Sequence, residues 1–141
     1  AGGCDGRPVL LSGYSQGAEV VVRAVGRLSA VEQAGVTVAL FGNPSYLPGQ
    51  PGDYPGDSLA TGIRPSFRHV ALRLPPAVRR RTIDVCATGD PVCGVDPDRT
   101  SVVGKVEFVL THVHIHTHEY AFGPEGYAAI AAKFLWDHRT H

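Results

Sequence analysis

The chain has 141 residues, and its 13 Lys and Arg balance its 13 Asp and Glu, so the formal net charge is zero. This balance argues against a nucleic-acid-binding domain, which usually carries a basic excess. Hydrophobic residues make up 43% and charged residues 18%, which is a globular rather than a disordered composition. No apolar run approaches the roughly 20 residues of a membrane span. We therefore expect one globular domain over residues 1–141, without integral membrane contact.

Three apolar runs, each closed by a glycine within two residues, predict buried strands at 7–12, 36–41 and 82–87. Continuous hydrophobicity is typical of a parallel sheet covered on both faces. Apolar residues recur at helical spacing over 18–28 and again over 127–138. Between them, proline-rich residues 44–76 predict a long ordered loop or partial cap. The alternation predicts a three-layer α/β/α fold with a small, mainly parallel sheet.

The junction of the first strand and helix carries a G-x-S-x-G motif, Gly13-Tyr14-Ser15-Gln16-Gly17. In such a turn the serine hydroxyl stands above the sheet edge, and the flanking glycines avoid steric clashes. The backbone N–H of Gln16, at the start of the helix, can donate to an oxyanion. We therefore expect Ser15 to be a catalytic nucleophile and Gln16 to supply an oxyanion donor.

A nucleophilic serine needs a base and an orienting acid, which in this fold follow it in the order acid, then histidine. Asp90 follows the third predicted strand, at the sheet edge where catalytic loops lie. Three other candidates have a weaker placement: Asp84, Asp96 and Asp98. Asp90 also lies between Cys86 and Cys93, and a disulfide there would hold its turn and indicate an oxidising compartment.

The base must come from a run of alternating histidines, His112, His114, His116 and His118. On an extended strand all four imidazoles would share one face. Such H-x-H spacing can also bind zinc, which leaves a metal-binding module over 112–118 as an alternative function. Because no Cys or acid cluster at ligand spacing accompanies the run, we favour a solvent-facing stripe with one catalytic member. We expect no metal and no other cofactor.

Together these features resemble the cutinase family, which are secreted serine esterases of the α/β-hydrolase class. The resemblance is carried by Gly13–Ala18, by the cysteine-bracketed segment 86–93 with Gly89-Asp90, and by a histidine just before a C-terminal helix. The segment Phe41-Gly42-Asn43-Pro44 is similar to a further family segment. Carried over by position, the resemblance implies Ser15 as the nucleophile, Asp90 as the orienting acid and a Cys86–Cys93 disulfide.

The resemblance leaves the base open between two histidines. His118 is favoured because it lies nearer the Gly123-Pro124 that leads into the last helix, and His116 follows closely. The family usually places an aromatic residue three positions after its catalytic histidine. Neither candidate satisfies that spacing, since Tyr120 follows them by two and four residues.

The implied activity is hydrolysis of apolar acyl esters, such as cutin, other polyesters or lipids, through an acyl-enzyme and outside the cell. The chain resembles the C-terminal portion of a cutinase-like domain. In the family, a cysteine at the position of Cys4 pairs with one nearer the N-terminus of the domain. We therefore expect an upstream segment of the same domain to pair with Cys4. The second alternative function is a non-catalytic half-domain that needs such a segment.

Overall fold

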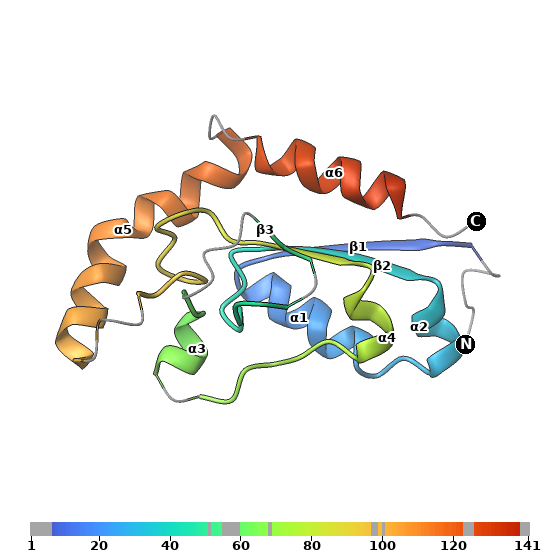
Figure 1. Ribbon diagram of the computed structural model, residues 1–141, viewed down its shortest axis with the longest axis horizontal. Helices are drawn as coiled ribbons and strands as arrows, with labels where there is room; N and C mark the ends of the chain where they lie inside the picture. Colours follow the sequence, from blue (N-terminus) through green and yellow to red (C-terminus); the bar gives the residue numbers. More distant parts are fainter. Residues whose placement is uncertain are drawn as a thin grey trace.

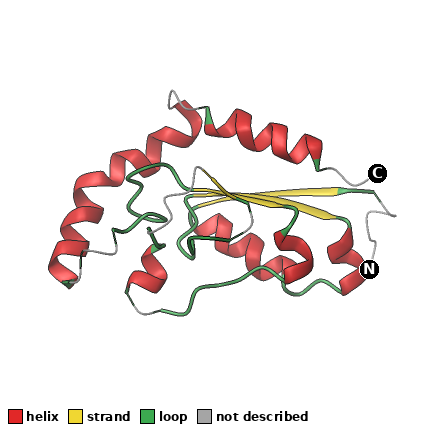
Figure 2. Ribbon diagram, in the orientation of Figure 1, coloured by secondary structure: helices red, strands yellow, loops and turns green. Residues whose placement is uncertain are grey.

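A computed structural model of the protein describes residues 7–50, 52–54, 60–67, 69–96, 99, 101–122 and 126–138. It has the predicted α/β architecture, with a parallel sheet between two layers of helices (Figures 1 and 2). Cys4, Asp98 and Gly123-Pro124, which the sequence singled out, lie outside the described residues. No helix in the described part of the chain combines the length and apolar character needed to cross a membrane.

The sheet has four strands in the order β1-β2-β4-β3, and every pair is parallel. The strands are β1 Val9–Tyr14, β2 Val36–Phe41, β3 Asp53–Tyr54 and β4 Thr82–Val85. The three predicted strands are confirmed as β1, β2 and β4, with β1 shifted by two residues. β3 is a two-residue strand in the segment that we expected to be a loop.

The helices are α1 Gln16–Val25, α2 Ala30–Ala34, α3 Ile63–Ser66, α4 Pro76–Arg79, α5 Val102–Phe122 and α6 Tyr127–Asp137. Helices α1, α2 and α4 cover one face of the sheet, and α6 covers the other (Figure 1). Residues 44–76 contain only short regular elements within their described part, in keeping with the predicted ordered loop.

Each face of the sheet has its own hydrophobic core. The α1 and α4 side contains Ala18, Val22, Val25, Val36, Val38, Leu40, Leu74 and Val78. The α6 side contains Ala39, Ile83, Val85, Ala87, Tyr120, Tyr127 and Ala131. Strand β2 contributes alternate residues to both cores, which is why its sequence is continuously apolar.

Strand β1 is less covered than β2. It pairs only with β2 among the described strands, and its residues alternate between half-buried and exposed. Leu10 is 49% exposed and Tyr14 is 45% exposed, whereas every residue of β2 from Val36 to Leu40 is buried. The expectation of a strand buried on both faces is therefore confirmed for β2 and wrong for β1.

The histidine run lies on helix α5, so it is not the extended strand on which all four imidazoles would share one face. The alternation of polar and apolar residues gives a period of two, but burial follows the helical period, with Phe108, His116 and Tyr120 buried. The helix begins beside Ser101, whose Oγ accepts the Gly104 N–H at 3.0 Å and so caps the first turn. The four imidazoles therefore do not share one face.

Candidate active site

Ser15 lies on the sharp turn between β1 and α1, at the carboxyl end of the strand. Its φ of 54° and ψ of −125° make it the one non-glycine residue with a positive φ in the described ranges. Such a conformation costs on the order of 1–3 kcal/mol and is typical of functional turns. The Ser15 N–H donates to the Phe41 carbonyl of β2 at 2.9 Å, which extends the β1–β2 ladder into the turn.

The two glycines of the motif have different roles. A Cβ on Gly13 would lie 2.5 Å from the Gly17 carbonyl oxygen, so only glycine fits at position 13. A Cβ on Gly17 would meet no atom within 4 Å outside its own helix. The steric argument made from the motif is therefore confirmed at Gly13 and wrong at Gly17. Gln16 is the first residue of α1, where backbone N–H groups have no acceptor within the helix.

Asp90 lies in the turn after β4, and its side chain is fully buried. The Cys86–Cys93 disulfide implied by the resemblance is present and closes this turn. Backbone hydrogen bonds shape it further, because the Asp90 N–H donates to Ala87 at 2.9 Å and the Gly94 N–H donates to Asp90 at 2.8 Å. The Val92 N–H donates to Asp90 Oδ1 at 2.7 Å. The carboxylate is thus held from its own loop.

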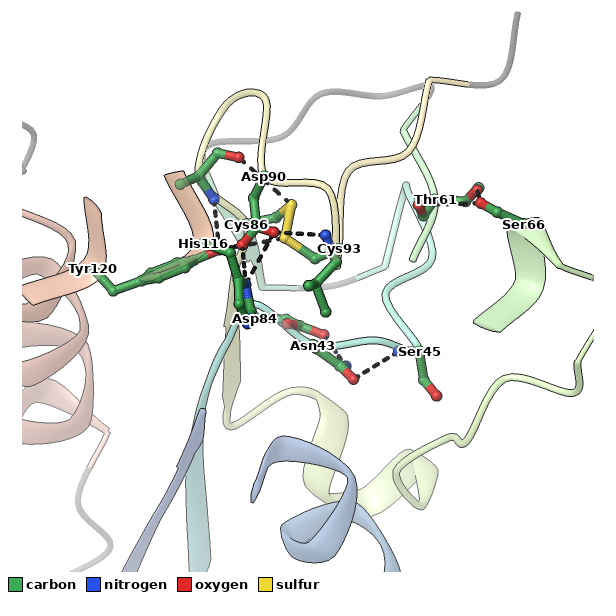
Figure 3. Close-up of a disulfide and its surroundings, with 12 residues drawn as sticks. Asn43, Ser45, Thr61, Ser66, Asp84, Cys86, Asp90, Cys93, His116 and Tyr120 are labelled. Atoms are coloured by element: carbon green, nitrogen blue, oxygen red, sulfur yellow. Dashed lines mark hydrogen bonds and ion pairs between the residues drawn. A yellow bond between two sulfur atoms is a disulfide. The ribbon is translucent and has the colours of Figure 1, made fainter. Parts of the chain in front are cut away.

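His116 is buried against Asp90, with Nδ1 at 3.0 Å from Oδ1 and 2.9 Å from Oδ2 (Figure 3). An ionised carboxylate only accepts hydrogen bonds, so Nδ1 carries the proton and Nε2 of the neutral ring is the basic nitrogen. The imidazole stacks on the Tyr14 ring at 4.8 Å between centroids. The Tyr14 hydroxyl donates to the His116 carbonyl oxygen at 2.5 Å. These contacts fix both the ring and its backbone.

The structure pairs Asp90 with His116, the second candidate, and not with His118, the candidate favoured from the sequence. On a helix, residues two apart point about 200° away from each other, so only one of the two can face Asp90. His118 and His114 are exposed, and His112 Nδ1 lies 3.0 Å from the Phe108 carbonyl oxygen one turn earlier. No group of three or more His, Cys, Asp or Glu in the described parts of the chain could hold a metal ion.

The Ser15 turn and the Asp90–His116 pair lie at the same edge of the sheet. Tyr14, the residue before Ser15, stacks on the imidazole. Gly42 directly follows Phe41, whose carbonyl oxygen accepts the Ser15 N–H, and it lies under the same ring. A Cβ on Gly42 would come 2.6 Å from His116 Cε1. Gly42 also has a φ of 55°, which favours glycine. Tyr14, which precedes Ser15 in the chain, and Gly42, which lies beside it on the next strand end, therefore both lie against His116.

The other candidate acids lie elsewhere. Asp84 of β4 accepts a hydrogen bond from Asn43 Nδ2 at 2.8 Å and lines a separate pocket under the sheet. Asp96 lies 3.9 Å from Arg99. Asp90 is hydrogen-bonded to a histidine of the run, His116.

An apolar pocket of about 290 Å³ opens beside the imidazole. It is lined by Tyr14, Phe41, His116, Thr117, Tyr120 and Ala128. The lining comes from two strands and both C-terminal helices, so the pocket depends on the packing of α5 and α6 against the sheet. An apolar group bound there would lie next to the basic nitrogen.

A family model described as Cutinase matches residues 2–121 of the chain. The protein belongs to the cutinase family. Cutinase CUT1 of Coprinopsis cinerea is 35% identical over 91 residues, which are 64% of this chain and 34% of that protein. A solved structure titled "A novel cutinase-like protein from Cryptococcus sp." superposes with a TM-score of 0.52 at 26% identity, over 84% of this chain and 60% of that one.

The sequence reasoning for this cutinase family member missed several residues of the site. In the sequence, Tyr14 occupies only a variable position of the motif, and Tyr120 is only an aromatic residue near the histidines. The i, i+4 spacing of His116 and Tyr120 was a usable signal, since it places both on one face of a helix. The role of Gly42 follows only from the position of the His116 ring above it.

Proposed function

We propose that the protein is a carboxylic-ester hydrolase that works through an acyl-enzyme, with Ser15 as nucleophile, His116 as base and Asp90 as orienting acid. The observation that carries the proposal is the buried Asp90–His116 pair, beside the strained turn that presents Ser15. Family membership supports the same class of reaction.

Each residue has a defined step. His116 Nε2 takes the Ser15 proton as Oγ attacks the ester carbonyl, and it then returns that proton to the leaving alcohol. Asp90 accepts the Nδ1–H bond and stabilises the imidazolium while it exists. The Gln16 N–H at the start of α1 donates to the oxyanion. Water activated by His116 then attacks the acyl-enzyme, releasing the acid and restoring the Ser15 hydroxyl.

We infer that the substrates are apolar acyl esters at a lipid or polymer surface. The support is the apolar pocket beside His116 and the names of the two relatives, both of which contain the word cutinase. A short or medium acyl chain in this pocket would lie beside the base. The Cys86–Cys93 disulfide supports secretion, because such bonds persist in oxidising compartments.

The test is a Ser15→Ala variant assayed on p-nitrophenyl butyrate. We expect kcat to fall by about 10⁶-fold, since loss of a triad nucleophile removes the covalent route. Ser12→Ala is the matched control, because Ser12 is exposed on β1, three residues before Ser15. Its activity should equal that of the wild type. Retention of most of the activity by Ser15→Ala would refute the assignment.

The second candidate function is a half-domain that turns over esters only with an additional segment. It is favoured by the exposure of Leu10 and Tyr14 on β1, which pairs only with β2 among the described strands. The length of the relatives supports it too, since the chain covers 34% of one and 60% of the other. Comparing kcat of residues 1–141 with that of a protein extended at its N-terminus distinguishes the two functions.

A further inference from the structure

Tyr120 reaches the same carboxylate as His116. It follows His116 by one helical turn on α5, and both side chains point to Asp90 beside the disulfide (Figure 3). The Tyr120 hydroxyl donates to Asp90 Oδ2 and accepts the Ala87 N–H at 3.0 Å. The same hydroxyl lies 3.4 Å from Cys93 Sγ. The Tyr120 hydroxyl therefore connects helix α5 to the turn that carries Asp90, at Ala87, Asp90 and Cys93.

The direction of the Tyr120–Asp90 hydrogen bond follows from its partners. The Ala87 N–H occupies a lone pair of the phenol oxygen, and the carboxylate can only accept, so the phenol proton points to Oδ2. Burial, together with the charge of Asp90, raises the pKa of Tyr120 well above its usual range. The phenol therefore keeps its proton at any pH at which an esterase works.

The ring of Tyr120 has little freedom. It packs edge-on against Phe41 and Tyr14, each at 5.8 Å between centroids, and against Tyr127 at the same separation. Tyr120 is 8% exposed. The hydroxyl is thus fixed by packing that does not involve Asp90, as a positioning group requires.

We propose that Tyr120 is a positioning residue that sets the plane of the Asp90 carboxylate, and this rests on the proposed function of Asp90 and His116. The Val92 N–H fixes Oδ1 and the Tyr120 O–H fixes Oδ2, so the carboxylate is held at both ends. Nδ1 of His116 then meets both oxygens at nearly equal distance. Without the Tyr120 hydroxyl, Oδ2 keeps only the bond to His116 among the described residues, so the plane of the carboxylate is held from its own loop at Oδ1 alone.

The hydroxyl also disperses the negative charge of Asp90. Removing it increases the attraction between Asp90 and an imidazolium at His116, so His116 should keep its proton to higher pH. The titratable side chains that act on the pair or on Tyr120 come from three elements: Tyr14 of β1 and Tyr120 of α5 contact the pair, and Asp84 of β4 acts on Tyr120 through its charge. Of these, only Tyr120 loses its hydroxyl in the experiment below.

The test compares Tyr120→Phe with Tyr127→Phe, which removes a hydroxyl from a neighbouring buried ring of the same core. For Tyr120→Phe we expect kcat to fall roughly 10- to 100-fold with KM unchanged, because misplacement of the base costs rate rather than binding. The acidic limb of the kcat/KM profile should move to higher pH. Tyr127→Phe should keep the wild-type kcat and pH profile.

A readout without catalysis separates this proposal from the proposed function. In a Ser15→Ala background with ¹³C-labelled histidine, NMR titration gives the pH midpoint of His116. An upward shift in Tyr120→Phe, absent in Tyr127→Phe, supports the proposal even if no variant hydrolyses esters, in which case only the esterase function fails. An unchanged midpoint together with an unchanged kcat overturns it.

Should Tyr120→Phe not fold, a fluorinated tyrosine at position 120 keeps the ring and the hydroxyl but makes the phenol a stronger donor. The His116 midpoint should then move to lower pH, the opposite direction. No movement of the midpoint in the fluorinated protein overturns the proposal.

Discussion

Asp84 and Asp90 lie six residues apart in one segment, yet their surroundings differ. Asp90 follows β4 and its carboxylate accepts hydrogen bonds from His116, Tyr120 and the Val92 backbone. Asp84 lies within β4 on the side of α1 and α4, where Asn43 donates to Oδ2 while Oδ1 is buried with no partner in the described part of the chain. One carboxylate is fully hydrogen-bonded and the other is not.

The incomplete hydrogen bonding of Asp84 affects the pKa of its carboxyl group. Burial raises its pKa to about 7, the Asn43 hydrogen bond lowers it in part, and the charge of Asp53 raises it. Asp53 is its neighbour in β3, and burial raises the pKa of that carboxyl to about 6. For Asp84, burial outweighs the single hydrogen bond from Asn43, because Oδ1 has no partner in the described part of the chain.

The largest loss of kcat should come from removing His116, the histidine that is hydrogen-bonded to Asp90. We expect His116→Ala to lower kcat by about 10⁶-fold on a p-nitrophenyl ester, because it removes the general base. His118→Ala is the matched control, since His118 lies on the exposed side of the same helix and should stay within a few-fold of the wild type. The opposite ranking of the two variants would transfer the base to His118.

A carboxylate-to-amide change at each acid tests the comparison directly. Asp90→Asn should lower kcat by about 10⁴-fold, because an amide can hold the imidazole in the wrong tautomer. Asp84→Asn should leave kcat unchanged, since Asp84 lies on the other side of the sheet from the apolar pocket. Equal losses in the two variants would show that the Asp90–His116 contact is not the functional one.

Asp84→Asn should instead change stability, by an amount that grows as the pH rises. The folded pKa of about 7 exceeds the unfolded value of 3.8, so the folded state binds the extra proton. Its contribution to stability is complete below about pH 4 and is lost as the pH rises through 7. Urea unfolding should find the variant more stable than the wild type at pH 8, by up to about 4 kcal/mol, and the difference should shrink steadily as the pH falls until it vanishes near pH 4. A difference independent of pH would contradict this explanation.

The smallest expected effect concerns the disulfide, which closes the Asp90 turn but not the strand that carries Asp84. Cys86→Ala/Cys93→Ala should lower the free energy of unfolding by roughly 2.5 kcal/mol, the entropy of closing a loop of about eight residues. Activity should fall with it, because the turn positions Asp90. Mass spectrometry without reductant should find the two cysteines linked in the active wild type. Full activity in the double variant would show that backbone hydrogen bonds suffice.

Much of the fold could be predicted because burial leaves a direct mark on the sequence. Strand β2 lies under helices on both faces and is an almost uninterrupted apolar run, whereas β4 keeps apolar residues at Ile83 and Val85. The positions of Ser15 and Asp90 could be predicted as well, since a motif or a cysteine pair marks each turn. In these places local sequence and tertiary packing agree.

The features that the sequence did not predict depend on contacts between residues far apart in the chain. Helix α5 is rich in β-branched residues and alternating histidines, which favours a strand, but packing of Phe108, His116 and Tyr120 at helical spacing decides its structure. Choosing His116 over His118 needed that helix first, because the periodicity determines which ring faces Asp90. The exposure of β1 is not visible in its apolar run alone, since such a run does not reveal the place of its strand in the sheet order.

The backbone of Ser15 has a consequence for protein engineering. At its φ of 54°, glycine has a lower backbone strain energy than serine. Ser15→Gly should therefore raise the melting temperature while removing the proposed nucleophile, since relief of such strain is worth about 1–3 kcal/mol. A library of this protein sorted by heat resistance alone would enrich that variant. Directed evolution of this protein should therefore select on turnover before it selects on temperature.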